Sequence, residues 1–230
     1  MSGLFKFPVV LLAGAAVGGI LAVPSGAAGK ALCPNVQIQP RIFLETNPGK
    51  TVTDTTKSRS QISRLKFKRG GAPRKRGWHP IGLTVADLKF GMEISVQVLS
   101  RSQKNHCASV DAVRASIGFG QITVYVAKRY RRGSCQYRSI LNHEQEHVDI
   151  FRDALTVHAP KVEHRLTELA GKLKPVSAST VERAANKLQN TLQKEMAPLF
   201  KELNKAIDAE NERIDTLENY RREQARCSSW

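Results

Sequence analysis

Acidic and aromatic residues are scarce in this chain of 230 residues. It has 20 Asp and Glu against 36 Lys and Arg, which gives a formal net charge of +16. Aromatic residues make up 6% of the chain, and no series of them could stack on bases, so we do not expect a nucleic-acid partner. The positive charge instead favours anionic partners, such as phospholipid head groups or anionic cell-wall polymers.

Long apolar runs are almost missing as well, and the exception lies at the N-terminus. Residues 7–23 are almost wholly apolar, Lys6 precedes them, and Pro24 and the small residues 26–28 follow. This order is typical of a secretory signal peptide, so we expect residues 1–28 to be cleaved and the protein to be secreted or periplasmic. The alternative is a retained anchor, although 17 residues rich in Gly and Ala are few for a membrane span. No transmembrane helix is expected after cleavage, which leaves a charge of +15.

Cysteine is rare, with four residues and no Cys-x-x-Cys pair, which gives no support to a thioredoxin-like redox site or a zinc ribbon. An even number of cysteines in an exported chain predicts two disulfide bonds, and the sequence allows three connectivities. We expect Cys107 to pair with Cys135, tying the β region to the helix that follows it. Cys33 would then pair with Cys227.

The most informative stretch is residues 139–151, which contain the motif His-Glu-x-x-His at positions 143 to 147. Residues four apart lie on one face of a helix, so His143 and His147 can bind one metal ion together. Glu144 would then take a proton from metal-bound water, which is the arrangement of zinc peptidases. The alternative is a buried histidine pair without metal, with Glu144 at a solvated edge.

Alternation and periodicity around the motif predict an α+β protein with an antiparallel sheet. Expected strands cover residues 36–45, 92–99, 107–117 and 121–130, and Thr84 is expected to cap a short helical turn. The motif helix should begin after Ser134 as its N-cap, be apolar on both sides and therefore buried, and end near Pro160. Two further helices are expected at 161–173 and 180–226, the second kinked or broken at Pro198.

The expected organisation is a signal peptide at 1–28, an N-terminal strand and basic loop at 29–79, and a zincin-like metallopeptidase domain at 80–230. The loop carries a run of cations, interrupted by glycine and proline: Arg64, Lys66, Lys68, Arg69, Arg74, Lys75 and Arg76. Such a run is typical of a solvated flexible loop, and it is also the candidate surface for anionic envelope material.

From about Pro80 to the C-terminus the chain resembles a bacterial family of predicted secreted zinc-dependent proteases, a domain of unknown function. The resemblance is firmest over 107–155 and rests on the strand, Cys135 and the motif helix. It implies a zincin-like fold and a bound Zn²⁺. Two positions depart from the family. Glu146 stands where the family usually has Gly, and Tyr220 stands at the His of a Tyr-Asp-x-x-Thr-x-His-Gly pattern.

A catalytic zinc ion needs a third protein ligand besides His143 and His147. The sequence leaves several candidates open: Asp153, Glu163, His164, Glu168, Glu210, Asp215 and Glu218. On a continuing helix Asp153 points about 80° away from the histidine face. For each candidate alone, an ordinary surface or capping role is the competing interpretation.

These features predict an exported zinc metalloprotease that hydrolyses peptide or protein substrates, with His143 and His147 as ligands and Glu144 as general base. The strand at 121–130 is expected to bind an extended peptide along its edge. The rival prediction is a non-catalytic, basic envelope-binding module with a degenerate metal site. Hydrolysis of a non-peptide amide in the envelope is a third possibility that the sequence does not separate from proteolysis.

Overall fold

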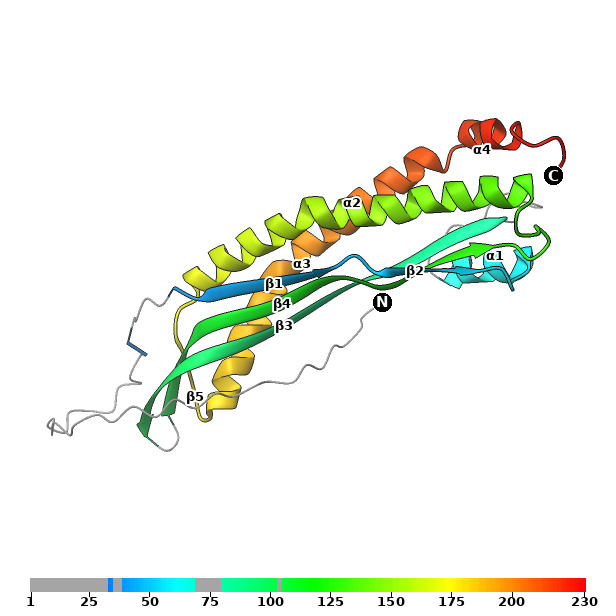
Figure 1. Cartoon of the computed structure of the whole chain (residues 1–230). Helices are drawn as coiled ribbons and strands as arrows, with labels where there is room; N and C mark the ends of the chain where they lie inside the picture. The colour runs from blue at the N-terminus through cyan, green and yellow to red at the C-terminus, as the bar shows by residue number, and fades with distance from the viewer. Residues whose placement is uncertain (1–32, 35–38, 69–79, 103–104) are drawn as a thin grey trace, which may run out of the picture. The chain divides into compact units, whose positions relative to one another are not determined.

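The computed structural model describes residues 33–34, 39–68, 80–102 and 105–230. Within them the chain is α+β, with five strands and four helices (Figure 1). In chain order these are β1 (Arg41–Asn47), β2 (Lys50–Asp54), α1 (Arg59–Lys68), β3 (Gly82–Ser102), β4 (Asn105–Val126), α2 (Cys135–Lys172), β5 (Val176–Ala178), α3 (Val181–Ile214) and α4 (Leu217–Gln224). The expected signal peptide, and the cations of the basic run from Arg69 onward, lie outside the described residues.

The chain forms two compact units that are interleaved along the sequence. Residues up to Glu45, Gly91–Ser116 and Pro160–Leu199 form the first unit, and Thr46–Phe90, Ile117–Ala159 and Phe200–Trp230 form the second. Because the long elements continue from one segment to the next, the unit boundaries fall within strands and helices rather than in linkers.

In the sheet, β4 is hydrogen-bonded to each of the other four strands. Strand β2 runs parallel to it, with Lys50 opposite Gln121 and Asp54 opposite Tyr125, whereas β5 is antiparallel to it. The expectation of an antiparallel sheet therefore fails at β2. Parallel pairing is possible here because β2 and β4 are not joined by a hairpin, which would require antiparallel strands.

Two glycines with positive φ allow the turn before β2 and the close approach of Asn47 to β4. Gly49 has φ of +76° and its N–H is 3.0 Å from Asn47 Oδ1, as expected for a turn at Asn-Pro-Gly. Gly118 has φ of +150°, and a Cβ atom there would lie 2.0 Å from the carbonyl oxygen of Asn47. Residues 105–126 are thus one long strand, and not two strands separated by a turn at this glycine.

Three predictions upstream of the motif were wrong. Residues 59–68 form the helix α1 and not a loop, with Ile62 fully buried between the polar residues around it. Thr84 lies in β3 and caps no helix, since β3 begins at Gly82. The strand edge at 121–125 is not open to a peptide, because β2 pairs with it and Ala127 N–H donates to Ile81 O just beyond it.

In the first unit, β5 pairs with β4 through Ala108 opposite Val176, and the core combines strand and helix residues. The buried apolar side chains include Met92, Ile94, Val110, Val113, Val162, Leu166, Leu188, Leu192 and Met196. Buried Gln189 is satisfied by donating from Nε2 to Met92 O at 2.9 Å. The apolar face that the sequence predicts for α3 is therefore buried in the core of this unit.

The motif helix α2 starts as predicted, because Ser134 Oγ accepts from Tyr137 N–H at 3.1 Å. It does not end at Pro160 but continues to Lys172. Pro160 and Thr156 are both exposed, so water can reach the carbonyl that loses its helical partner. In the second unit the helix is buried by contacts such as that between Phe151 and Phe119, whose ring centroids are 5.5 Å apart.

The single helix that the sequence predicts at 180–226 is two helices in the structure, α3 and α4. Pro198 lies inside α3 without ending it, and α3 stops at Ile214. Thr216 then caps α4 by accepting from Asn219 N–H at 3.1 Å, and Asn219 Nδ2 donates back to Ile214 O at 2.9 Å. Asp215 therefore lies at a corner between two helices and not on a helix face.

Two disulfide bonds form, but the expected pairing is wrong. Cys33 bonds Cys107, and Cys135 bonds Cys227. Each cysteine finds its partner within its own unit, because α4 brings Cys227 back to the first residue of α2. Among the described residues, no helix has the length and apolar character needed to cross a membrane.

Candidate metal centre

Helix α2 places the two motif histidines on its buried side. His143 and His147 are one turn apart, and 5% and 8% of their surfaces are exposed. Their Nε2 atoms lie 3.3 Å from each other, and the ring planes are at 89°. Both imidazoles therefore direct the same nitrogen to one point in front of the helix.

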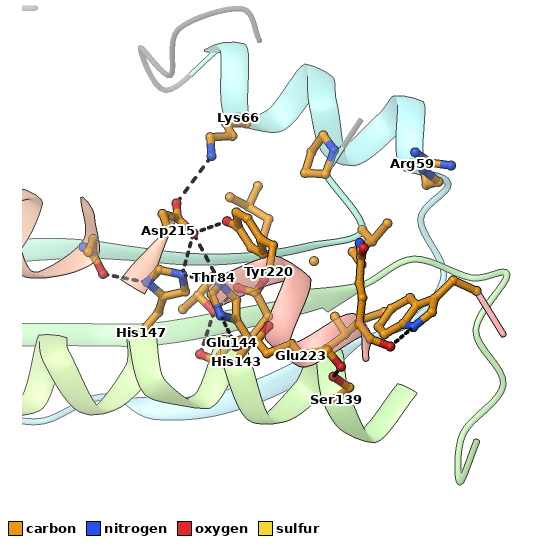
Figure 2. Close-up of a pocket in the computed structure, with 18 of the residues that line it drawn as sticks. Arg59, Lys66, Thr84, Ser139, His143, Glu144, His147, Asp215, Tyr220 and Glu223 are labelled. Carbon is orange, nitrogen blue, oxygen red and sulfur yellow. Dashed lines mark hydrogen bonds and ion pairs between the residues drawn. The ribbon is translucent and has the colours of Figure 1, made fainter. Parts of the chain in front are cut away.

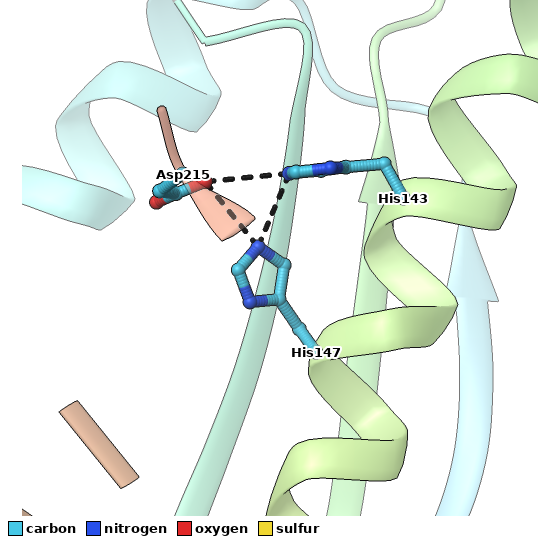
Figure 3. A group of neighbouring side chains, drawn as sticks. All are labelled: His143, His147 and Asp215. Carbon is cyan, nitrogen blue, oxygen red and sulfur yellow. Dashed lines mark hydrogen bonds and ion pairs between the residues drawn. The ribbon is translucent and has the colours of Figure 1, made fainter. Parts of the chain in front are cut away.

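Asp215 completes the group from the corner between α3 and α4. Its Oδ1 atom is 3.3 Å from His143 Nε2 and 3.4 Å from His147 Nε2 (Figure 3). The three atoms form a nearly equilateral triangle. Of the seven candidates for the third ligand, Asp215 is the one that the structure brings to the histidines.

The triangle has the dimensions of a zinc site. Zinc binds His nitrogen and Asp oxygen at about 2.0–2.1 Å, and a tetrahedron of that radius has edges of about 3.3 Å between ligand atoms. A zinc ion held by these three atoms would have a fourth position for water or another ligand. The donor set of two imidazoles and one carboxylate is that of catalytic zinc sites.

The outer nitrogens of both rings are held by oxygen acceptors. His143 Nδ1 lies 3.1 Å from Glu223 Oε1, and His147 Nδ1 lies 2.7 Å from Asn211 Oδ1. A carboxylate and an amide oxygen can only accept, so each Nδ1 carries the proton. In the neutral imidazole this leaves the lone pair on Nε2, the atom that faces Asp215.

Electrostatics also favour a positive charge at the triangle. Burial lowers the pKa of His143, but the hydrogen bond to Asp215 and the charges of Glu144 and Glu223 outweigh it and raise the pKa to about 9. The pKa of His147 is raised in the same way against the effect of burial. Partial burial raises the pKa of half-buried Asp215, but its bonds with both histidines and Tyr220 outweigh this and hold the pKa well below the ordinary value. The centre is therefore built to stabilise a cation, whether protons or a metal ion.

Glu144 lies beside the triangle and is fixed by strand β3. Its Oε2 accepts from Thr84 Oγ1 at 2.8 Å, and the same hydroxyl is 2.9 Å from the Glu144 carbonyl oxygen. Burial raises the pKa of Glu144, although the histidines and Thr84 act in the opposite direction. A Cβ atom at Gly82 would lie 2.3 Å from Glu144 Oε1, so only glycine lets the strand come this close.

These groups line a cavity of about 340 Å³ in the second unit. Figure 2 shows its walls, with α2 on one side and α1 on the other. Tyr220 donates a hydrogen bond to Asp215 Oδ1, and Lys66 Nζ on α1 lies 3.8 Å from Asp215 Oδ2. The cavity has room for a small ligand or for a side chain of another molecule beside the histidines.

The other predicted ligands have different surroundings. Asp153, Glu163, His164 and Glu218 are exposed, Glu168 pairs with Arg165 and Lys172, and Glu210 pairs with Arg213. Within the described chain a second group of metal-ligating type combines His143 with Glu146 and Glu223. It offers one histidine and an exposed Glu146, and its Glu223 already accepts from His143 Nδ1, so it fits a zinc ion less well.

Sequence reasoning missed several residues of this centre. Asn211, Glu223, Gly82 and the role of Thr84 carry no recognisable spacing, since each reaches α2 from a distant part of the chain. Tyr220 had been noted for the His that it replaces. In the structure Tyr220 lies beside His143, and the centroids of the two rings are 5.2 Å apart.

Comparison with known proteins adds no name to this geometry: no family model, no curated protein and no solved structure matches the chain.

Proposed function

We propose that this protein is an exported zinc-dependent metalloprotease. One observation carries the proposal: the triangle of His143 Nε2, His147 Nε2 and Asp215 Oδ1, with sides of 3.3 to 3.4 Å. A degenerate site, as in a non-catalytic envelope-binding module, would lack the third ligand. Here Asp215 offers the third ligand, and the hydrogen bonds at both Nδ1 atoms suit metal binding through Nε2.

A zinc ion held by these three atoms would polarise a carbonyl oxygen and acidify a water molecule. The chain's own residues supply the proton transfers. Glu144, with its raised pKa, accepts a proton at its carboxylate from water and gives it to the nitrogen of the leaving amine. Thr84 and Gly82 keep the carboxylate in place, and Glu223 and Asn211 keep the two rings from rotating.

Export is part of the proposal. The apolar segment at 7–23 has the order of a signal peptide, and the four cysteines form two disulfide bonds. Disulfides persist in oxidising compartments such as the periplasm and the extracellular space. Peptide bonds are the preferred substrate because the motif is that of zinc peptidases, and an envelope amide would use the same chemistry.

The decisive experiment compares two glutamates of the motif. Glu144→Gln removes the base but keeps the shape, so turnover of an unfolded protein substrate should fall by about 10² to 10⁴ while one zinc per chain is retained. Glu146→Gln is the matched control, because Glu146 is exposed on the same helix turn and should leave both quantities unchanged. If Glu144→Gln cleaves as fast as the wild type, the protease proposal is wrong. Zinc content is measured for each variant. Cleavage of an envelope glycopeptide amide, assayed in parallel with cleavage of the protein substrate, separates proteolysis from hydrolysis of a non-peptide amide.

A further inference from the structure

The cavity wall opposite α2 carries two cations that the protease proposal does not use. Arg59 and Lys66 both line the cavity from α1 (Figure 2). They are seven residues apart, so they lie on the same face of the helix, about 10.5 Å from each other along its axis. Ile62, which is fully buried, lies between them and fixes this face toward the interior of the second unit.

Lys66 lies close to the metal position. Its Nζ atom is 3.8 Å from Asp215 Oδ2, which is longer than the usual 2.7–2.9 Å of a charged hydrogen bond. The attraction is therefore one between charges rather than a direct hydrogen bond. An ion on Asp215 Oδ1 would share the charge of that carboxylate and weaken its attraction for the ammonium.

A divalent ion at the triangle would make the net charge of the loaded cavity lining positive. Besides the two histidines, the charged side chains are Arg59 and Lys66 against Glu144, Asp215 and Glu223. With the ion bound to neutral histidines, its two charges and the two cations would exceed the three carboxylates by one positive charge. Together with the chain's charge of +16, this favours an anionic substrate in the loaded cavity.

We infer that the cavity selects peptides with a carboxylate on the residue next to the scissile bond, and that Lys66 recognises it, with Arg59 as a second cation further along the wall. The inference rests on the proposed protease function. From the 3.8 Å contact and a metal–oxygen distance of about 2 Å, Lys66 Nζ lies within about 8 Å of the ion. One residue of chain spans about 3.8 Å, so a carboxylate on the neighbouring residue can reach the ammonium.

Two sources can supply this carboxylate, an acidic side chain or the free C-terminus of the peptide. A peptide that the wild type cleaves would be made in three forms: Glu beside the cleaved bond with an amidated end, Gln at that position with an amidated end, and the Gln form ending one residue after the bond with a free carboxylate. We expect the Glu form, the free-carboxylate form or both to be cleaved with kcat/KM about 10 to 100 times that of the amidated Gln form.

Lys66→Met should reduce this ratio to below about threefold, with one zinc per chain retained. Lys66→Arg should keep the preference. Arg64→Met is the matched control, because Arg64 is exposed on the same helix and does not line the cavity. A wild type that cleaves all three forms equally, or a Lys66→Met variant with an unchanged ratio, would overturn the inference and leave the protease proposal standing.

Binding separates the failure of this inference from failure of the protease proposal. The three peptides, carrying a fluorescent label, would be titrated with zinc-loaded Glu144→Gln protein and followed by anisotropy. Tighter binding of the carboxylate forms, lost in the double variant with Lys66→Met, supports the selectivity even if the wild type cleaves none of them. Equal binding of all three forms overturns it.

Discussion

The Nδ1 atom of His143 lies 3.1 Å from Oε1 of Glu223, although 80 residues separate them in the chain. This contact joins α4 to the motif helix, and Ser139 Oγ, which lies 3.4 Å from Glu223 O, adds a second contact at the same place. A carboxylate behind a ligating imidazole fixes the ring and makes Nε2 more basic. In the proposed metal centre, Glu223 would therefore act as a positioning residue for His143.

Glu223→Gln should weaken zinc binding by about 10- to 100-fold, because the amide holds the ring less firmly and adds no charge behind it. Competition with a chromophoric chelator measures the affinity. Glu218→Gln is the control, since Glu218 is exposed on the same short helix. Equal affinities of the two variants would show that Glu223 does not act on the metal.

Asp215→Ala should lose zinc under conditions where the wild type holds one ion per chain, with affinity lowered by more than about 100-fold, because one of three ligands is removed. Asp153→Ala and Glu210→Ala, which alter two exposed carboxylates among the other candidate ligands, should keep the metal. Metal content after dialysis against trace zinc distinguishes them. Retention of zinc by Asp215→Ala would assign the third ligand to another residue.

How far the sequence predicted this centre depends on the range of each interaction. The His143 and His147 pair and the Ser134 cap were predictable, because a helix fixes the relation between residues three or four apart. Asp215 could be named only as one of seven candidates. The position of Asp215 depends on the end of α3 at Ile214 and on the cap at Thr216. The apolar periodicity continues across this break, so the sequence predicts one continuous helix there.

The sheet was harder to predict for a related reason. Alternation identified the segments of β3 and β4, yet it carries no information about which strands pair or in which direction. Strand β2, which pairs parallel to β4, and helix α1 both lie in a polar, basic stretch whose composition is typical of loops. Among residues 59–66 of α1, whose side chains the structure describes, Ile62 is the one buried residue, and one residue is too weak a pattern to predict a helix without the rest of the core.

Gly82→Ala should lower turnover by at least about tenfold without loss of zinc. The added methyl group would lie 2.3 Å from Glu144 Oε1 and 2.8 Å from Ile140 Cγ2, so the carboxylate must leave its position beside the triangle. Gly171→Ala is the matched control. No atom lies within 4 Å of a Cβ there, and alanine should stabilise α2 by up to about 1 kcal/mol. Peptide hydrolysis and zinc content are measured for both, and a Gly82→Ala enzyme of wild-type rate would show that Glu144 is not the base.

The last prediction concerns pH. In the metal-free protein the pKa of His143 is raised from about 6.5 to about 9, chiefly by Asp215, Glu144 and Glu223, against the effect of burial. The folded state therefore holds this proton more tightly than the unfolded state. The resulting stabilisation is complete below about pH 6.5 and is lost as the pH rises toward 9. Chemical unfolding of the metal-free protein at pH 6.5, 7.5 and 9 should give a free energy of unfolding that falls across this range.

Zinc reverses this dependence, because the ion needs the lone pair on Nε2 that the proton occupies. Zinc affinity should rise from pH 6.5 to 9, and binding at pH 7 should release protons. Calorimetric titrations in buffers with different ionisation enthalpies count the protons released. His164→Gln, which alters an exposed histidine, should change neither curve. A metal-free protein that becomes more stable from pH 6.5 to 9, or zinc binding without proton release, would show that the two histidines are not the shared site of proton and metal.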